Sequence, residues 1–292
     1  MMVTAVPGPV FIVGAGKAGT AMACSLRDAG FPVSLVIRRP AGRPLPVPST
    51  NLDSLVLPSG RPAVVLFAVP DRLLAEVALS LASKADPGTR LVLGHLSGVF
   101  PSTGLAPDNR DRVIGRFSAH PLFAFPPAHP PLPLPGQVPF LIEGDEAGMT
   151  IARALVLSID GLPIPIDPSR KPLAHGAAVL AANLPAELVF IAADVFRDLG
   201  VPDPERVAAR LFRSLADNLD SLPSPAALTG PVVRGDRETV AANLEALVQW
   251  AGGTPEVPSL YRRLSRRLAS RIRRFRTSGS PSSGKKPWEV SR

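Results

Sequence analysis

The feature that most constrains this chain is a glycine-rich turn between two apolar runs, VFIVGAGKAGTAMACSL at residues 10–26. Residues 10–14 predict a buried strand and residues 20–30 a helix closed by glycine, because a continuous apolar run gives way to helical spacing. The pattern G-x-G-x-x-G is weak alone, since an ordinary strand–loop–helix can carry it. A second predicted strand at residues 33–39 completes the context and favours a dinucleotide-binding turn.

The three glycines of this turn have separate physical roles. Gly14 permits the tight turn, Gly16 lets the backbone approach a pyrophosphate, and Gly19 allows the helix to pack closely on the strand. The amides at the helix start and the helix dipole then face the anionic phosphates. We predict cofactor contacts from every residue of the turn: Gly14, Ala15, Gly16, Lys17, Ala18 and Gly19.

The end of the second predicted strand bears on which dinucleotide would bind. NAD-binding proteins usually place a carboxylate there for the ribose 2′-hydroxyl, whereas this chain has Arg38 and Arg39. A guanidinium matches the geometry of a phosphate, so the two arginines favour the 2′-phosphate of NADP over NAD. The alternative is a solvated basic loop.

Further segments extend the α/β pattern through the first half of the chain. Residues 63–70, 90–98, 112–121 and 138–145 predict strands, and residues 71–85 predict a helix with Asp71 as its N-cap. Strands that are apolar throughout are typical of parallel sheets covered on both faces. Residues 1–167 are therefore predicted to form a doubly wound (Rossmann) α/β domain with a parallel sheet.

The character of the sequence changes after residues 162–167. Three segments have helical spacing with no strand candidate between them, which predicts a smaller all-α domain over residues 168–276: 171–200, 205–220 and 236–251. Residues 277–292 are rich in Ser, Gly and Pro and predict a disordered basic tail.

The formal net charge of +8 is concentrated at the end of the chain. From Arg262 to Arg292 there are eleven Lys and Arg against one acid, which leaves 21 basic and 23 acidic residues in the rest of the chain. The basic helix expected at 260–275 carries a leucine stripe, which favours packing on its own domain or a dimer partner over binding a membrane surface or nucleic acid. Nucleic acid is an unfavoured partner because stacking aromatics are nearly absent there.

Several other classes of protein find little support. No run reaches the eighteen or so uninterrupted apolar residues of a membrane span. A single cysteine, Cys24, cannot form an internal disulfide, and the N-terminus lacks a basic leader, so we expect a cytoplasmic protein. Four scattered histidines show no metal-ligand spacing, and no metal site is predicted.

Five motifs recur in the same order in one protein family: FAVPD (67–71), GHLSG (94–98), SAHPLFAF (118–125), KPLAHGAAVLAANL (171–184) and ALTGPVVRGD (227–236). Over residues 8–250 the chain resembles the family that pairs a Rossmann-like NAD(P)-binding domain with a C-terminal helical domain of unknown function. That family is similar to 6-phosphogluconate dehydrogenase-like, pyrroline-5-carboxylate reductase-like and prephenate dehydrogenase-like proteins. An alternative type of ketopantoate reductase has a similar architecture.

The resemblance implies an NAD(P)-dependent oxidoreductase and several site residues. It implies cofactor contacts from the FAVPD motif, at Ala68, Val69 and Pro70. The family often has the segment Tyr-His-Ala-Ala-Ala, and the corresponding segment of this chain, residues 174–178, is Ala-His-Gly-Ala-Ala. The histidine is His175, and Ala174 stands where the family has tyrosine, so a tyrosine hydroxyl is missing. If that hydroxyl binds substrate in relatives, the activity of this chain is in doubt.

Polar residues in the first helix of the predicted helical domain are candidates for catalysis. Lys171 and His175 are four residues apart and project from neighbouring points of one helix face, and Asn183 falls about 80° round from His175 by helical periodicity. Related hydroxyacid dehydrogenases have Lys and Asn spaced by four there, with His175 taking the place of that Asn. A buried histidine satisfied by a backbone carbonyl and a solvated lysine are the alternatives.

Further candidates follow the predicted strands. His95 and Ser97 lie beyond the carboxyl end of one strand, where ligands bind in doubly wound folds, and we predict cofactor contacts from both. His120 has an analogous place, and its His-Pro pair resembles the one near the substrate in prephenate dehydrogenases. Arg234 could hold a substrate carboxylate, whereas Asp236 is more simply a helix cap.

Together these observations predict an NADP-dependent oxidoreductase. It would reduce a small carbonyl or imine compound, with a 2-oxoacid such as ketopantoate as one candidate, at a cleft between the two domains. His175, Asn183, Lys171 and His120 are the predicted catalytic residues. We expect a homodimer formed through the helical domain. The alternative is a catalytically silent NADP-binding sensor or scaffold, which the missing tyrosine motivates.

Overall fold

The computed structural model describes residues 8–42, 44–106, 112–126, 130–222 and 226–277. The chain divides into two compact units, Met1–Ala182 and Asn183–Arg292, which we call unit 1 and unit 2. This division lies later than the change in sequence character near residue 167, because the helix that begins at Lys171 packs that side chain into unit 1. The predicted disordered tail lies outside the described residues, apart from Thr277 at the end of a helix.

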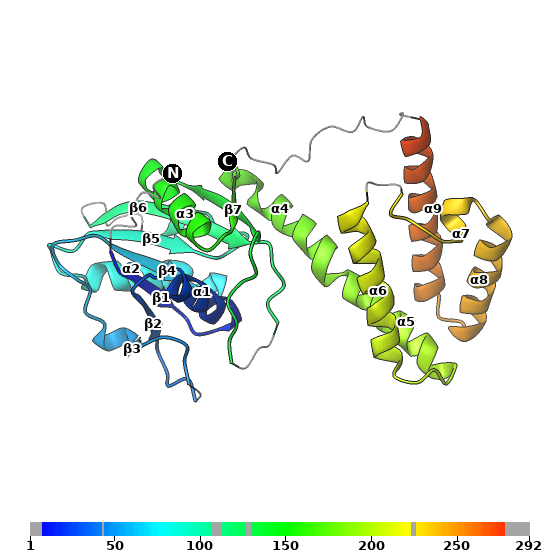
Figure 1. The fold of residues 1–292 in the computed structure, drawn as a ribbon, viewed down its shortest axis with the longest axis horizontal. Helices are drawn as coiled ribbons and strands as arrows, with labels where there is room; N and C mark the ends of the chain where they lie inside the picture. The colour runs from blue at the N-terminus through cyan, green and yellow to red at the C-terminus, as the bar shows by residue number, and fades with distance from the viewer. Residues whose placement is uncertain (1–7, 43, 107–111, 127–129, 223–225, 278–292) are drawn as a thin grey trace. The chain divides into compact units, whose positions relative to one another are not determined.

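Unit 1 is built on one eight-stranded sheet in the order β3-β2-β1-β4-β5-β6-β7-β8. Strands β1 to β7 are labelled in Figure 1. The order reverses between β1 and β4, which are neighbours, so this sheet has the switch point of a doubly wound fold. The predicted α/β class is confirmed. The strands are β1 (Val10–Val13), β2 (Val33–Ile37), β3 (Ser49–Asn51), β4 (Ala63–Phe67), β5 (Leu91–His95), β6 (Val113–Pro121), β7 (Pro139–Gly144) and β8 (Leu162–Pro165).

The sheet is mostly rather than wholly parallel, which corrects the sequence prediction. β7 runs antiparallel to β6, with His120 opposite Leu141. The described part of the connection between these strands holds no crossover helix, and antiparallel neighbours need none. Strands β3 and β8 were not predicted from the sequence. β3 is short and largely exposed, and β8 contains two prolines, which only an edge strand tolerates.

Helices cover both faces of the sheet. One buried cluster joins Ile12 to Leu26 and Leu155, and a second joins Phe67 to Leu74, so alternate residues of the strands enter different cores. The first cluster lies under α1 and α3 and the second under α2. These helices are α1 (Lys17–Asp28), α2 (Asp71–Lys84) and α3 (Glu146–Ser158).

The prediction that Asp71 caps α2 is wrong. Asp71 is the first residue of the helix, and the N-cap position belongs to Pro70, which has no side chain to accept a hydrogen bond. The Asp71 carboxylate instead accepts a hydrogen bond of 2.8 Å from the Ser97 hydroxyl, in the loop after β5. A partner 26 residues away overrode the local capping preference.

A long helical stretch carries the chain from unit 1 into unit 2. It begins as α4 (Lys171–Ala178), widens into a π-helix at Val179–Asn183, and continues as α5 (Pro185–Asp198). A π-helix has a wider turn than an α-helix, so side chains after it are rotated relative to those before it. The stretch Pro168–Asp198 is the one helix among the described residues that is long and apolar enough, by length and composition, to cross a membrane. That is weak support for a span, because Lys171 at its start is enclosed in unit 1.

Unit 2 is all helical in its described part. α5 packs on α6 (Pro204–Ser221), and α7 (Pro231–Arg234), α8 (Arg237–Trp250) and α9 (Glu256–Thr277) pack on one another (Figure 1). The Asp236 carboxylate accepts hydrogen bonds from the Thr239 amide (3.0 Å) and hydroxyl (2.7 Å), which confirms its predicted role as a helix cap. Ile272 on the stripe of α9 is buried, whereas Leu264 remains exposed.

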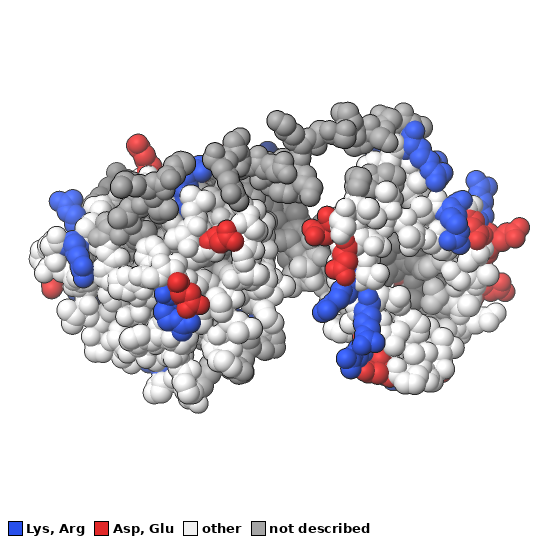
Figure 2. Space-filling view, viewed as in Figure 1, with Lys and Arg blue, Asp and Glu red and all other residues white. Residues whose placement is uncertain are grey.

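Charged side chains of both signs are interspersed on the visible face of each unit (Figure 2). This agrees with the near balance of charge before Arg262. Described arginines are dense only on α9, which carries eight between Arg262 and Arg276. α9 is therefore the most positively charged element of the described chain.

Candidate functional site

The glycine turn after β1 has the geometry that its sequence pattern predicts. Gly14 has a φ of +114°, and a Cβ on it would lie 2.5 Å from the carbonyl oxygen of Ala68. A Cβ on Gly19 would overlap the carbonyl oxygen of Gly14. Both positions need glycine because backbone from β1, β4 and α1 meets there without room for a side chain.

Gly16 is different, because the protein itself leaves its surroundings open. A Cβ on Gly16 would have no heavy atom within 4 Å. Gly16 is the N-cap of the twelve-residue helix α1, and no acidic side chain lies in the first turn. The amides at the start of α1 and the positive end of its dipole thus face space that an external anion can enter.

A cavity of about 410 Å³ lies beside the turn. Its wall includes the ends of β1 and β2, with Gly14, Ala15, Val36, Arg38 and Arg39, and also Val69 from the segment after β4. No carboxylate is among its lining residues, whereas two guanidinium groups are. Two of the three FAVPD residues predicted to contact the cofactor therefore lie at the turn, with the Ala68 carbonyl against Gly14 and Val69 in the cavity wall, and the third, Pro70, directly precedes α2.

A buried ion pair lies deeper in unit 1, under the start of α4. The Nζ atom of Lys171 is 3.1 Å from Oε1 of Glu143 on β7, and each side chain is 2% exposed. Nζ also donates to the Ser118 hydroxyl (2.5 Å) and the Ser97 carbonyl (3.2 Å). All three ammonium hydrogens are therefore engaged. Burial lowers the pKa of Lys171, and the negative charge of Glu143 opposes this only in part.

The carboxylate of Glu143 is equally well satisfied. Its Oε1 accepts from the Ser102 amide (2.9 Å) and its Oε2 from the Ser102 hydroxyl (2.6 Å). Such complete pairing is what allows two charges to be buried. The pair ties α4 to β7, β6 and the loop after β5, and so fixes where α4 begins on the sheet.

His95 is enclosed at the end of β5 and stays neutral. Its Nδ1 accepts a hydrogen bond from the Ser97 amide (3.1 Å), and its ring makes an edge contact with Phe100. Burial, and next the positive charge of Lys171, lower the pKa of His95 to about 3. With its side chain wholly buried, His95 shapes the following loop, and it cannot act as a proton donor near neutral pH.

Ser97 organises the same loop from its outer side. Its hydroxyl donates to Asp71 and accepts hydrogen bonds from the Val99 (3.1 Å) and Phe100 (2.9 Å) amides. Ser97 is only half-buried, so unlike His95 it remains accessible at the carboxyl edge of the sheet.

His120 and His175 lie edge to face, with their ring centroids 5.5 Å apart. The Nδ1 of His120 is 2.9 Å from the Leu96 carbonyl, which can only accept, so the proton of neutral His120 is on Nδ1 and Nε2 has the free lone pair. A Cβ on Gly98 would lie 2.6 Å from His175 Nδ1 and 2.9 Å from His120 Nε2. The two rings therefore converge on space that only glycine leaves open.

The two histidines differ in how they can be reached. His175 Nδ1 is buried with no hydrogen-bond partner among the described residues, which leaves Nε2 as the accessible ring nitrogen. Burial lowers the pKa of His120, while its hydrogen bond to the Leu96 carbonyl opposes that shift. The structure thus brings together three of the predicted catalytic residues in unit 1: Lys171, His120 and His175.

Two predicted site residues fall in unit 2. Asn183 ends the π-helix, whose wider turn breaks the α-helical periodicity on which its predicted position rested. Arg234 ends α7, is exposed, and lies 3.8 Å from Asp236.

Sequence reasoning missed the acidic half of the site. Glu143, Ser102 and Ser118 were not singled out, although a glutamate inside the apolar segment VPFLIEGD is an unusual residue for a buried strand. A buried glutamate indicates that a polar partner must exist, but the sequence does not show which residue it is. The partners of Glu143 are Lys171 and Ser102, which are 28 and 41 residues away. No group of three or more His, Cys, Asp or Glu suited to a metal ion occurs within the described ranges.

Comparisons with known proteins agree with this architecture. Residues 138–268 match the model of a domain of unknown function, DUF2520. No curated protein gave a significant match.

Solved structures give broader matches. A crystal structure of a Thermotoga maritima protein is 25% identical with a TM-score of 0.70, covering 92% of this chain and 99% of that one. A Bacteroides fragilis protein provisionally described as an NADP oxidoreductase is 21% identical with a TM-score of 0.68, covering 90% and 98%. Pyrroline carboxylate reductase of Plasmodium falciparum, solved with NADP bound, is 10% identical with a TM-score of 0.54, covering 90% and 98%.

The last two likenesses, below 25% identity, are likenesses of fold. The chain therefore shares with these proteins the fold of a Rossmann-like unit followed by a helical unit, and its residues 138–268 match DUF2520.

Proposed function

We propose that the protein is an NADP-dependent oxidoreductase that reduces a small carbonyl or imine compound. The observation that carries the proposal is the cavity beside Gly14, which contains Arg38 and Arg39 and no carboxylate. NADP fits this site: Gly16 leaves room for a pyrophosphate at the N-terminus of α1, and the two arginines can hold a 2′-phosphate. The fold likeness to NADP-binding reductases supports the same assignment.

When bound, NADPH supplies a hydride to the carbonyl or imine carbon. The reduction also needs a proton for the oxygen or nitrogen that receives the displaced electron pair. We assign that proton to Nε2 of His175, the accessible nitrogen of the histidine pair. An imidazole can carry and release a proton near neutral pH.

Lys171 is assigned a positioning role within the same proposal. Its ammonium is enclosed and has three partners, so it holds α4 on the sheet and thereby places His175, one helical turn later. Asn183 remains a proposed catalytic residue, and Arg234 remains a proposed contact for the substrate, suited to a carboxylate such as that of a 2-oxoacid, ketopantoate included.

The cofactor half of the proposal is tested by binding. Arg38→Ala/Arg39→Ala should raise the Kd for NADPH by about 10-fold or more, since a charge-assisted hydrogen bond contributes about 1.5–3 kcal/mol, and should change the Kd for NADH by less than about threefold. Arg61→Ala/Arg90→Ala, which removes the same charge from arginines outside this cavity, is the matched control. Equal weakening of NADH and NADPH, or no weakening, would refute the NADP assignment.

The catalytic half is tested by turnover. NADPH oxidation is followed against 2-oxoacids, ketopantoate and cyclic imines with the wild type and His175→Ala. The variant should lose turnover and keep its NADPH affinity, because His175 is absent from the cavity that holds the arginines. Normal turnover by His175→Ala would remove its role as proton donor.

A catalytically silent NADP-binding sensor is the second candidate. It is favoured by Ala174, which stands beside His175 where relatives often have tyrosine. NADPH binding without consumption across the whole panel would support this alternative over a reductase.

We also propose that the protein is a cytoplasmic homodimer formed through the helical domain. Large apolar side chains of α5 and α6 are exposed in the single chain, including Phe190 (59%), Leu211 (60%) and Leu219 (49%). Several large apolar side chains exposed on two packed helices are typical of an interface. Light scattering on the full chain should give twice the mass of one chain, and a monomer at micromolar concentration would contradict the dimer.

A further inference from the structure

Unit 2 contains a second cavity, of about 520 Å³, between α9 and the pair α7 and α8. Its size is within the range of small-molecule sites. The motif ALTGPVVRGD, which the proposed reductase site uses only for Arg234, supplies one wall of this cavity through Val232 and Val233.

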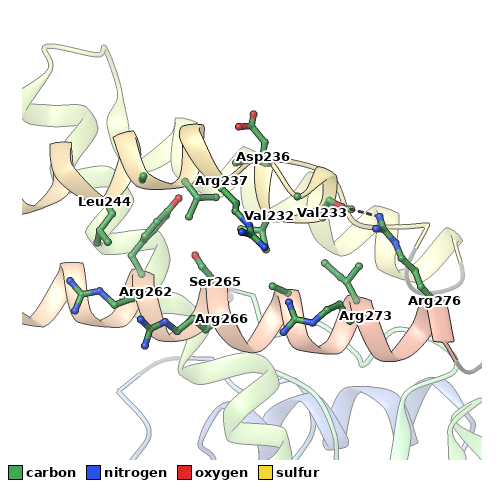
Figure 3. A pocket seen from close by; sticks show the side chains of 17 residues that line it. Val232, Val233, Asp236, Arg237, Leu244, Arg262, Ser265, Arg266, Arg273 and Arg276 are labelled. Atoms are coloured by element: carbon green, nitrogen blue, oxygen red, sulfur yellow. Dashed lines mark hydrogen bonds between the residues drawn. The ribbon is translucent and has the colours of Figure 1, made fainter.

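The floor of the cavity is apolar. Val232, Val240, Leu244, Ala269 and Ile272 line it, and Ile272 is only 4% exposed. The Ser265 hydroxyl points into the space between α8 and α9 (Figure 3). An apolar floor with few polar groups is the usual composition of a ligand site.

The rim of the cavity is strongly positive. Five arginines line it, one from α8 and four from α9: Arg237, Arg262, Arg266, Arg273 and Arg276. Arg276 donates to the Val233 carbonyl (3.1 Å), so its guanidinium is already held at the cavity. Figure 3 shows Arg237 projecting from α8 toward α9, which brings positive charge from both sides of the space.

The single acidic residue in the lining does not neutralise this rim. Asp236 accepts hydrogen bonds from Thr239 at the start of α8, and its side chain points away from α9 (Figure 3). Like charges gathered around a concave, low-dielectric surface repel one another and attract counter-ions strongly. An anion in the cavity would relieve that repulsion.

We propose that this cavity binds an amphipathic organic anion, a small molecule with an apolar body and a phosphate or carboxylate head. The apolar body would lie on Val240, Leu244 and Ala269, and the head would meet the arginines. Guanidinium groups bind such heads in a planar, bidentate manner. The site lies wholly in unit 2 and is independent of the proposed NADP site.

Octyl phosphate, used below its critical micelle concentration, is a suitable probe because it has both an apolar body and a phosphate head. Isothermal titration calorimetry on the full chain should show binding about tenfold tighter than that of inorganic phosphate or octanol, because each control lacks one part. Arg262→Ala/Arg266→Ala should weaken octyl phosphate by about tenfold or more. The matched control is Arg263→Ala/Arg267→Ala, which removes equal charge from the same helix outside the cavity and should change the Kd by less than about twofold.

Ala269→Leu keeps every charge, fills part of the floor, and should weaken octyl phosphate while leaving the circular dichroism spectrum unchanged. Equal weakening by the two double variants would mean nonspecific attraction to α9 and would overturn the proposal. So would unchanged binding in Arg262→Ala/Arg266→Ala.

Two further arms separate this ligand class from larger partners. Phosphatidylglycerol vesicles test a lipid surface, and hexaglutamate tests an acidic protein segment. Octyl phosphate should bind as a monomer and be lost in the cavity variant. Vesicles or hexaglutamate binding in place of monomeric octyl phosphate would overturn the small-molecule assignment.

Discussion

The enclosed imidazole of His95 predicts a specific dependence of stability on pH. The folded pKa of His95 is lowered to about 3 from 6.5, mainly by burial. Below pH 6.5 the unfolded chain therefore binds a proton at this residue that the folded chain rejects, and unfolding becomes progressively more favourable as the pH falls toward 3. The contribution of neutral His95 to stability is complete above pH 6.5 and is lost on acidification.

The size of the effect follows from these two pKa values. Between pH 7.5 and pH 5.0 the loss at this one residue is about 2 kcal/mol, from the ratio of proton binding in the two states. The figure hardly changes for any folded pKa below about 4, because the folded residue is then neutral at pH 5. Titration of other groups adds to the total, so a variant must isolate His95.

His95→Asn provides that comparison. The Asn Oδ1 can accept the hydrogen bond that Nδ1 accepts from the Ser97 amide, but Asn does not titrate. The free energy of unfolding of the variant should fall by about 2 kcal/mol less than that of the wild type between pH 7.5 and 5.0. Any loss of stability that is common to all pH values cancels in this difference.

The measurement must report on unit 1, and the tryptophans and the tyrosine all lie after residue 182. Met22 on α1 is 2% exposed, so its oxidation by hydrogen peroxide in a urea series, read by mass spectrometry, reports the opening of that core. Parallel pH dependence in the two proteins would refute the neutral burial of His95. If the variant does not fold, the NMR titration of His95 in the wild type decides, and a midpoint above pH 5 contradicts the reasoning.

Two further predictions concern unit 1. Glu143→Gln leaves the Lys171 ammonium buried without its counter-charge and should lower the free energy of unfolding by about 3–5 kcal/mol. Adding Lys171→Met should restore most of it; no recovery, by the Met22 assay, would mean that the charge pair is not the cause. Gly16→Val should leave stability within about 1 kcal/mol, because nothing lies near its Cβ, and should raise the Kd for NADPH about tenfold or more. Unchanged affinity would place the pyrophosphate elsewhere.

The parts of the fold that the sequence predicts well are those that local physics determines. The glycine turn is the best case, since the need for Gly14 and Gly19 arises from backbone contacts within one strand–turn–helix and its neighbouring strand. The Asp236 cap is equally local, because its partner is three residues away. For such features the residue type and its spacing already contain the cause.

The parts that the sequence did not predict depend on residues far apart in the chain. In the sequence Asp71 resembles a helix cap, but the sheet brings Ser97 beside it and the two side chains form a hydrogen bond. The burial of Glu143 in a strand is explained only by its contacts with Lys171 and Ser102. The same distant contacts change what Lys171 is for. By spacing alone it is a catalytic candidate beside His175, but an ammonium with three hydrogen-bond partners in the protein has no hydrogen left for a substrate. The ion pair of Lys171 with Glu143 therefore indicates that Lys171 positions α4. The proposed proton transfer is accordingly assigned to the pair of His120 and His175.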